Sequence, residues 1–414
     1  MKKLLIYVMI IAILLFSFSS CDFGSPASTD KKNPSQKNTS KATQTVLPTK
    51  NNSKIKIGIA CSIGDANGTE GQTVKNVVEL AIDEINAAGG LDGIKFEALV
   101  FDSNNYVTEK DLYEDLVDEG MQIFLGSTDR ESAVVFSELA EEDNIFVLSS
   151  GTFGGELDAF DTTYQMSGSA IEQGKEAAEF FNENYVGKKI GVFYRADEDH
   201  SSKIYKGFSE ALDPYFSVVT ADFTDEDFIY ESQVQLLKNC DVIFMPVEYD
   251  SAWIFMSQMK NVYNEVATYV GCDSFEMIND VENFDSFAIE QEIIFLSYFD
   301  SNATDGPVAD FFEKYSTEYD EEKETPRTLA ASVYDSVYAL FEALRMAKFN
   351  GKEISPNMSA SNLCTILEGI FESSYFEFRG ITGACEGDER SQIIWVDRKA
   401  QKEAVTVVVK ARSD

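Results

Sequence analysis

The hydrophobic and polar positions between residues 123 and 157 follow a pattern that organises our interpretation of the chain. Residues 123–126 form a short apolar run that ends at a glycine, and residues 145–148 form a second run that ends in two serines. Runs of this length between turn residues are typical of buried parallel strands. Apolar residues recur at helical spacing from 133 to 140. The stretch therefore predicts one βαβ unit.

The polar turns that follow these two predicted strands are a candidate ligand-binding rim. They comprise residues 126–132 and 149–153, which are mostly small or polar. Ligands of open α/β sheets bind outside the carboxyl ends of the strands, where backbone N–H groups and helix N-termini face the crevice. The alternative is that these are two ordinary connections without a binding role.

The same alternation continues along most of the chain. A glycine-rich loop separates the first predicted strand from a helix that begins near Thr73 and ends at Gly89 and Gly90. After Gly168 a second series of alternating strands and helices is predicted. Strands that alternate with helices indicate parallel sheets, and two such series indicate an α/β protein of two doubly wound lobes. The predicted strands are 54–62, 96–101, 123–126, 145–148, 189–194, 218–223, 242–247, 267–271 and 293–299.

The last quarter of the chain has its own signals. Thr325 followed by Pro326 is typical of a helix start, and the residues after it carry an apolar stripe to Leu344. A further helix is predicted near residues 359–371. The chain ends in two β-rich runs.

The N-terminus is typical of an export signal. Lys2 and Lys3 precede an apolar run at residues 4–18, which is too short to span a bilayer, and Ser19, Ser20 and Cys21 follow. This ending resembles a bacterial lipoprotein signal, with residues 1–20 removed and Cys21 lipidated; the alternative is a plain signal peptide. Residues 21–53 are polar and predict a flexible tether.

Composition excludes several classes of function. The net charge of −37 over 414 residues argues against a nucleic-acid partner, which needs a basic surface. A single histidine, His200, excludes His-rich metal sites and leaves a catalytic triad only one base. The acidic residues at 197–199 beside it favour a solvated turn over a metal site. Gly64 and Gly68 lack the lysine of a phosphate loop.

Several segments, in this order, resemble one family. The resemblance covers the chain from about Lys54 to its C-terminus and identifies it as similar to type I periplasmic substrate-binding proteins of the branched-chain amino acid (leucine/isoleucine/valine) group, which deliver ligands to ABC transporters. The segments that carry it are AIDEINAAGGL at 81–91, FDS at 101–103, AEEDNI at 140–145, LSS at 148–150 and FRGITG at 378–383.

This resemblance implies two Rossmann-like lobes joined by three crossovers, with the ligand in the cleft and closure by hinge motion. We place the crossovers near 168–171, 299–302 and 379–383. The first lobe then comprises residues 54–169 and 301–380, and the second comprises 170–300 and 381–414. No cofactor is implied.

The resemblance also assigns site residues by position. Arg130 stands at the position of the carboxylate-binding serine, with Ser132 close by; it contacts the ligand or pairs with a neighbouring acid on the surface. Asp273 follows a strand that ends in glycine and is the counterpart of the acid that holds the ligand ammonium. The remaining positions are Gly151, Thr152 and Phe153 for backbone donors, and His200, Tyr249 and Glu70 for the cleft wall.

The implied function is capture of a small amino acid or related amino-carboxylate for an ABC transporter permease. Two alternatives stay open: a sensor that presents its ligand to a membrane receptor, and a lipid-anchored hydrolase, against which the single histidine and the lack of a Gly-x-Ser-x-Gly motif argue. Cys364 and Cys385 are candidates for a disulfide, whereas Cys61 and Cys272 are expected to be free thiols.

Overall fold

A computed structural model describes residues 53–64, 68–127, 130–151, 155–224, 229–262, 268–282, 284, 287, 291–319 and 325–409. The expected signal, Cys21 and the tether up to residue 52 lie outside the described residues. Within the described part, no helix is long and apolar enough to cross a membrane.

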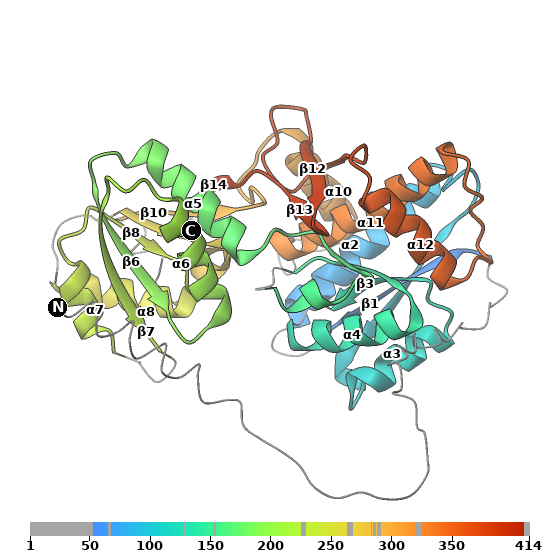
Figure 1. The fold of residues 1–414 in the computed structure, drawn as a ribbon, viewed down its shortest axis with the longest axis horizontal. Coiled ribbons are helices and arrows are strands. Elements are labelled where there is room, and N and C mark those ends of the chain that lie inside the picture. The colour runs from blue at the N-terminus through green and yellow to red at the C-terminus, as the bar shows by residue number, and fades with distance from the viewer. Residues whose placement is uncertain are drawn as a thin grey trace, which may run out of the picture. The chain divides into compact units, whose positions relative to one another are not determined.

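The first lobe is built on an eight-stranded mixed sheet with the strand order β11-β12-β13-β5-β4-β3-β1-β2 (Figure 1). The strands from β13 to β2 pair in parallel, while β11, β12 and β13 pair antiparallel. The strands are β1 (Ile55–Cys61), β2 (Phe96–Asp102), β3 (Ile123–Ser127), β4 (Phe146–Ser149), β5 (Thr163–Gln165), β11 (Phe378–Gly380), β12 (Ser391–Val396) and β13 (Lys399–Gln401).

Alternating side chains of this sheet pack against helices on both faces. Ile123 and Leu125 point into the core formed with α2 (Gly68–Ala87), α11 (Thr328–Phe349) and α12 (Ala360–Phe371), and α10 (Gly306–Glu318) adds to this core. Phe124 points to the opposite face, where α3 (Glu109–Asp118) and α4 (Arg130–Asp143) pack. Short 3-10 turns are η1 (Ser103–Asn105) and η2 (Glu156–Ala159). This burial on both faces is why the central strands β3 and β4 are almost entirely apolar.

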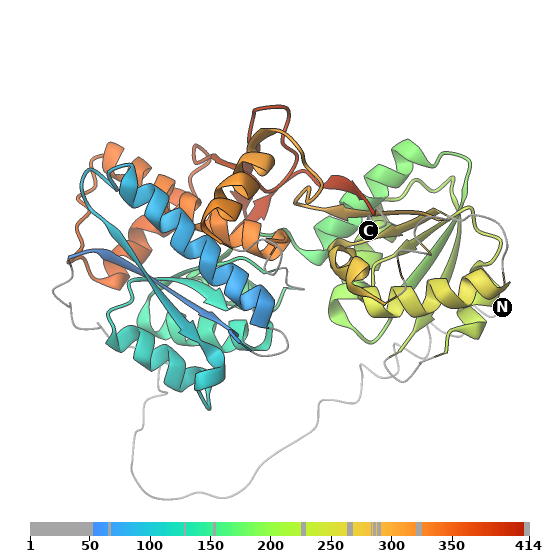
Figure 2. The same ribbon diagram turned by 180° about the vertical axis from the view of Figure 1, so that it is seen from behind.

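The second lobe has a six-stranded sheet in the order β14-β10-β9-β8-β6-β7, in which only β14 runs antiparallel. Figure 2 shows this lobe, mostly green and yellow, from behind. Its strands are β6 (Lys189–Arg195), β7 (Ser217–Phe223), β8 (Val242–Met245), β9 (Thr268–Gly271), β10 (Glu292–Ser297) and β14 (Val405–Val408). The helices α5 (Ala170–Asn184) and α6 (Asp199–Ala211) cover one face. The other face packs against α7 (Glu231–Leu237), α8 (Tyr249–Val262) and the 3-10 segment η3 (Asp273–Asp280).

The chain passes between the two sheets three times. The first two passages follow β5 and β10, near the expected positions, but the third follows β13, at residues 402–404, rather than at 379–383. The strands β11, β12 and β13 extend the first sheet, and Trp395 Nε1 donates a hydrogen bond of 3.1 Å to the Gln165 carbonyl. Residues 381–401 therefore belong to the first lobe, and their assignment to the second was wrong.

One helix start was predicted too early, and one helix was missed. The helix expected to begin at Thr325 begins at Thr328 with Arg327 as its N-cap, and the preceding helix α10, with Pro307 in its first turn, was not predicted. Cys364 and Cys385 are free thiols, as are Cys61 and Cys272.

Two glycines allow α5 and α6 to pack in close contact. A Cβ atom at Gly174 would lie 2.0 Å from the Ile204 carbonyl oxygen, and one at Gly207 would lie 2.0 Å from the Ile171 carbonyl oxygen. Both clashes are with backbone atoms, which cannot rotate away as a side chain can. The close approach of these helices therefore requires glycine at both positions.

We expect Gly174→Ala to destabilise the protein by about 1–3 kcal/mol, the usual cost of overpacking a core. Gly369→Ala is the matched control, because a Cβ atom at Gly369 in α12 meets nothing within 4 Å. This control should gain about 0.5–1 kcal/mol from its better helix propensity. Denaturant unfolding of both variants measures the difference, and equal stability of the two would contradict the packing argument.

Candidate functional site

An open pocket of about 370 Å³ lies where the carboxyl ends of strands from both sheets meet the start of α11. This volume is in the range of roughly 300–1,000 Å³ that small-molecule sites occupy. Turns after β4 and β5 contribute from the first lobe, and turns after β8 and β9 contribute from the second. The lining residues are Glu70, Ser150, Gly151, Ser167, His200, Glu248, Asp273, Ser274, Glu276, Met277, Arg327, Thr328, Leu329 and Ser332.

Asp273 enters the pocket because β9 ends at a glycine. A Cβ atom at Gly271 would lie 2.2 Å from the ring of the buried Phe275, so the turn into η3 needs glycine there. The Asp273 carboxylate accepts a hydrogen bond of 3.4 Å from Gln173 Nε2. His200 Nε2 lies 4.0 Å from Asp273 Oδ1, too far for a hydrogen bond but close enough for electrostatic attraction.

The environment keeps Asp273 ionised. Its side chain is 20% exposed, and burial opposes its charge, but the His200 ring and the Gln173 amide outweigh burial and hold the pKa of this carboxyl below its usual range. A carboxylate that stays charged while largely desolvated is a strong partner for a cationic group.

His200 reaches the pocket through a capped helix start. The Glu198 carboxylate accepts hydrogen bonds from the backbone N–H groups of His200 at 2.9 Å and Ser201 at 2.6 Å. The acidic residues at 197–199 therefore cap and begin α6, and His200 lies in its first turn, 8% exposed. The helix start aims His200 at Asp273.

The first lobe presents buried serine hydroxyls. Ser167 Oγ donates to the Ser150 carbonyl at 3.1 Å, and the hydroxyls of Ser150 and Ser336 lie 2.9 Å apart. Ser336 in turn donates to the Ser332 carbonyl at 2.8 Å. These bonds fix the turn after β4 against α11. This side of the pocket is polar, and Glu70 is its only carboxylate among the described lining residues.

The N-terminus of α11 is tied to η3 of the second lobe. Both carboxylate oxygens of Glu276 lie 3.0 Å from the Thr328 backbone N–H, which donates to them, and Arg327 Nη2 lies 2.5 Å from Asp280 Oδ2. Burial raises the pKa of Glu276 to about 7, against the opposing effect of these donors. Burial also raises the pKa of Glu70, and Arg327 partly offsets it.

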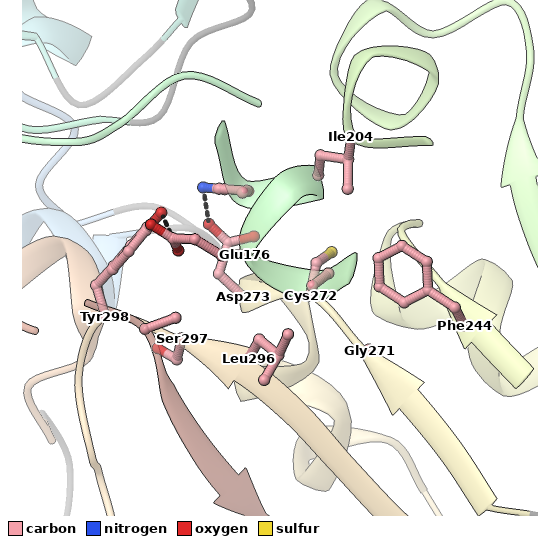
Figure 3. A pocket seen from close by; sticks show the side chains of 12 residues that line it. Glu176, Ile204, Phe244, Gly271, Cys272, Asp273, Leu296, Ser297 and Tyr298 are labelled. Carbon is pink, nitrogen blue, oxygen red and sulfur yellow. Dashed lines mark hydrogen bonds between the residues drawn. The ribbon is translucent and has the colours of Figure 1, made fainter. Parts of the chain in front are cut away.

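Beneath the pocket lies a cavity of about 20 Å³, lined mainly by residues of the second lobe (Figure 3). It shares Asp273 with the open pocket. In Figure 3 the Tyr298 hydroxyl donates to Glu176 Oε2, at 2.9 Å. Burial raises the pKa of Glu176 to about 8. The carboxylates of neighbouring glutamates act in the same direction, whereas the Tyr298 hydrogen bond acts to lower this pKa.

Comparison with known proteins identifies the family. The profile described as "Periplasmic binding protein" matches residues 54–369, most of the chain. The chain belongs to the periplasmic binding protein family. No curated protein sequence matches it. The two mixed sheets joined by three crossovers are those of the type I fold, as the sequence resemblance implied.

Solved structures share the fold of this binding protein at low sequence identity. The branched-chain amino acid transporter substrate-binding protein LivJ of Streptococcus pneumoniae, in complex with isoleucine, is 21% identical, with a TM-score of 0.62 over 86% of this chain and 99% of that one. A substrate-binding protein of Desulfitobacterium hafniense in complex with leucine is 18% identical, with a TM-score of 0.65 over 86% and 98%. A solute-binding protein of R. palustris in complex with 4-hydroxybenzoate is 14% identical, with a TM-score of 0.67 over 87% and 94%.

The structure brings four of the expected site residues of this binding protein into one pocket: Glu70, Gly151, His200 and Asp273. Thr152 and Phe153 lie outside the described residues. Arg130 begins α4, and its side chain is likewise outside the described part.

Two expected residues do not line this pocket. Ser132 lies in the first turn of α4, where its hydroxyl is 3.4 Å from Glu109 Oε1 of α3. Tyr249 begins α8 and packs against the core of the second lobe. The residue before it, Glu248, lines the pocket instead. The two positions differ by one residue, because the sequence does not show that α8 begins at Tyr249.

Most of the polar lining was not predicted from the sequence. Glu248 directly follows the strand predicted at 242–247, so the rule that ligands bind at carboxyl strand ends could have found it. Ser167 follows β5, a strand of three residues that was not predicted. Arg327 and Thr328 were missed because the start of α11 was placed too early. Nothing in the sequence indicated Glu276, since the 3-10 segment that carries it was not predicted.

The raised pKa of Glu176 predicts how stability depends on pH. The folded carboxyl keeps its proton up to about pH 8, whereas the unfolded one loses it near 4.5, so the folded state binds more protons in this interval and its stability falls as pH rises. Glu176→Gln removes the titration and should lessen this fall by on the order of 2–4 kcal/mol, since one pKa unit is about 1.4 kcal/mol.

Denaturant unfolding at pH 5, 6.5 and 8 measures this dependence. Glu183→Gln, an exposed change in the same helix, is the control and should follow the wild-type curve. If the Glu176→Gln protein loses as much stability over this range as the wild type, the assignment to Glu176 is wrong.

Proposed function

We propose that this periplasmic binding protein captures a small amino acid or related amino-carboxylate and delivers it to the permease of an ABC transporter. The observation that carries the proposal is the pocket, in which Asp273 of the second lobe and Ser150 and Gly151 of the first lobe face one space. A zwitterion is matched by these two sides: the ionised carboxylate receives its ammonium group, and backbone N–H groups of the turn after β4 receive its carboxylate.

A ligand of this kind couples binding to closure. It contacts the second lobe through Asp273 and the first lobe through the turn after β4, so it stabilises the arrangement in which both contacts are made. The ligands named for the similar structures, isoleucine, leucine and 4-hydroxybenzoate, all carry a carboxylate. This supports a carboxylate-bearing ligand, while the ammonium part of the proposal rests on Asp273.

We expect Asp273→Ala to weaken amino-acid binding by roughly 30-fold or more, because losing one partner of a buried charge pair costs about 2–5 kcal/mol. Calorimetry of ligand-stripped protein against amino acids, sugars and short peptides provides the measurement. Asp118→Asn, an exposed change on α3, is the control and should bind as the wild type does.

Two results would refute the zwitterion proposal: tight binding of an uncharged sugar by the wild-type protein, or unchanged amino-acid affinity in the Asp273→Ala protein. Circular dichroism of the variant distinguishes lost binding from lost folding.

We also propose that the protein is anchored outside the cytoplasm through a lipid on Cys21, as the apolar run at residues 4–18 and the small residues before the cysteine favour. Cys21→Ser should move the protein from the membrane fraction to the soluble fraction and abolish labelling by a fatty acid. A variant that stays in the membrane fraction without label would contradict the lipid anchor.

A further inference from the structure

Carboxylates dominate the charge of the pocket. Glu70 comes from α2, Glu248 precedes α8, and η3 contributes Asp273 and Glu276. Among the described lining residues, Arg327 is the only arginine or lysine. A zwitterionic ligand adds no net charge, so it would leave this excess of negative charge uncompensated.

The carboxylates form two groups, each with more negative than positive charge. In the first, Asp273 and Glu248 interact with His200, and the Asp273 carboxylate is among the causes that raise the pKa of Glu248, after burial. Even a protonated His200 offsets only one of these two carboxylates. The first group therefore keeps an excess of negative charge, which favours a cation beside His200.

In the second group, Arg327 is shared among three carboxylates. It lies 2.5 Å from Asp280 and also interacts with Glu70 and Glu276. Glu276 additionally accepts from the N-terminus of α11, which partly satisfies it. Burial raises the pKa of Glu70 and Glu276, so a cation bound beside them favours their ionised forms. One guanidinium does not neutralise three ionised carboxylates, so this group also favours a cation.

The pocket offers little apolar surface for a branched aliphatic side chain. Met277 and Leu329 are the only large apolar side chains among its described lining residues, which include no phenylalanine, tyrosine or tryptophan. Burial of apolar surface is what stabilises a bound leucine or isoleucine side chain. The lining thus opposes an apolar side chain while its charge favours a cation.

We infer that the ligand carries two positive charges and is an amino acid with a cationic side chain, of the lysine or ornithine type. This rests on the proposed function and names its ligand class. The α-ammonium group pairs with Asp273, the side-chain cation compensates the remaining carboxylates, and Glu248 determines the preference over apolar amino acids. The acidity of the whole chain, −37, adds a long-range attraction for cations.

The test is calorimetry of full-length mature protein, stripped of bound ligand by unfolding and refolding, with L-lysine, L-ornithine, L-leucine and 1,5-diaminopentane. We expect lysine or ornithine to bind at least tenfold more tightly than leucine, and Glu248→Gln to weaken that binding about tenfold while changing leucine binding less than threefold. Glu183→Gln, an exposed change in α5, is the charge-matched control and should bind all four as the wild type does.

The outcomes separate this inference from the proposed function. Leucine binding tighter than lysine and ornithine binding would overturn the inference and leave the proposed function intact, as would a Glu248→Gln protein with an unchanged preference for lysine. Failure of every amino acid to bind would overturn both. Equal affinity for 1,5-diaminopentane and lysine would support the requirement for two cations and contradict the carboxylate contact of the proposed function.

Discussion

The arrangement of the two sheets depends on one buried carboxylate, that of Asp335 in α11. Its side chain is fully buried and accepts hydrogen bonds from the backbone of Ile381 at 3.0 Å, from the backbone of Thr382 at 2.8 Å and from the Thr382 hydroxyl at 2.6 Å. That hydroxyl accepts from Lys402 Nζ at 2.8 Å. Burial raises the pKa of Asp335 and lowers that of Lys402 to about 8, so each charge depends on the other. Removing one partner of such a pair costs about 3–5 kcal/mol.

This network continues through all three passages between the sheets. Lys402 lies in the third passage, and Gly383 beside Thr382 donates its N–H to the Tyr298 carbonyl of the second, at 2.6 Å. The Tyr298 hydroxyl reaches Glu176 on α5, the helix that follows the first passage. The three connections are therefore joined below the pocket, so a change in the charge of any of these buried groups bears on how the lobes are held.

The sequence predicted the parts of this fold whose residues are periodic and missed those whose signal is short. The buried strands such as residues 123–126 and the stripe of α11 are long enough to be recognised by period alone. The late strands β11 and β13 have three residues each, too few to show a period, and the last crossover was therefore predicted in the wrong place. Asp273 was found because strand, glycine and acid are adjacent in sequence. The pairing of Glu276 with α11 joins residues 52 apart and has no local signal.

The described free cysteines have a consequence for how the folded chain reacts with disulfides. Cys61, Cys240, Cys272 and Cys364 are buried, and desolvation raises the pKa of all four, as it does that of the less buried Cys385. Only the thiolate attacks a disulfide, and protonated thiols out of contact with solvent are inert to exchange. The four buried thiols therefore react slowly with disulfides in the folded protein, and they are exposed to oxidation mainly before the hydrophobic cores form around them.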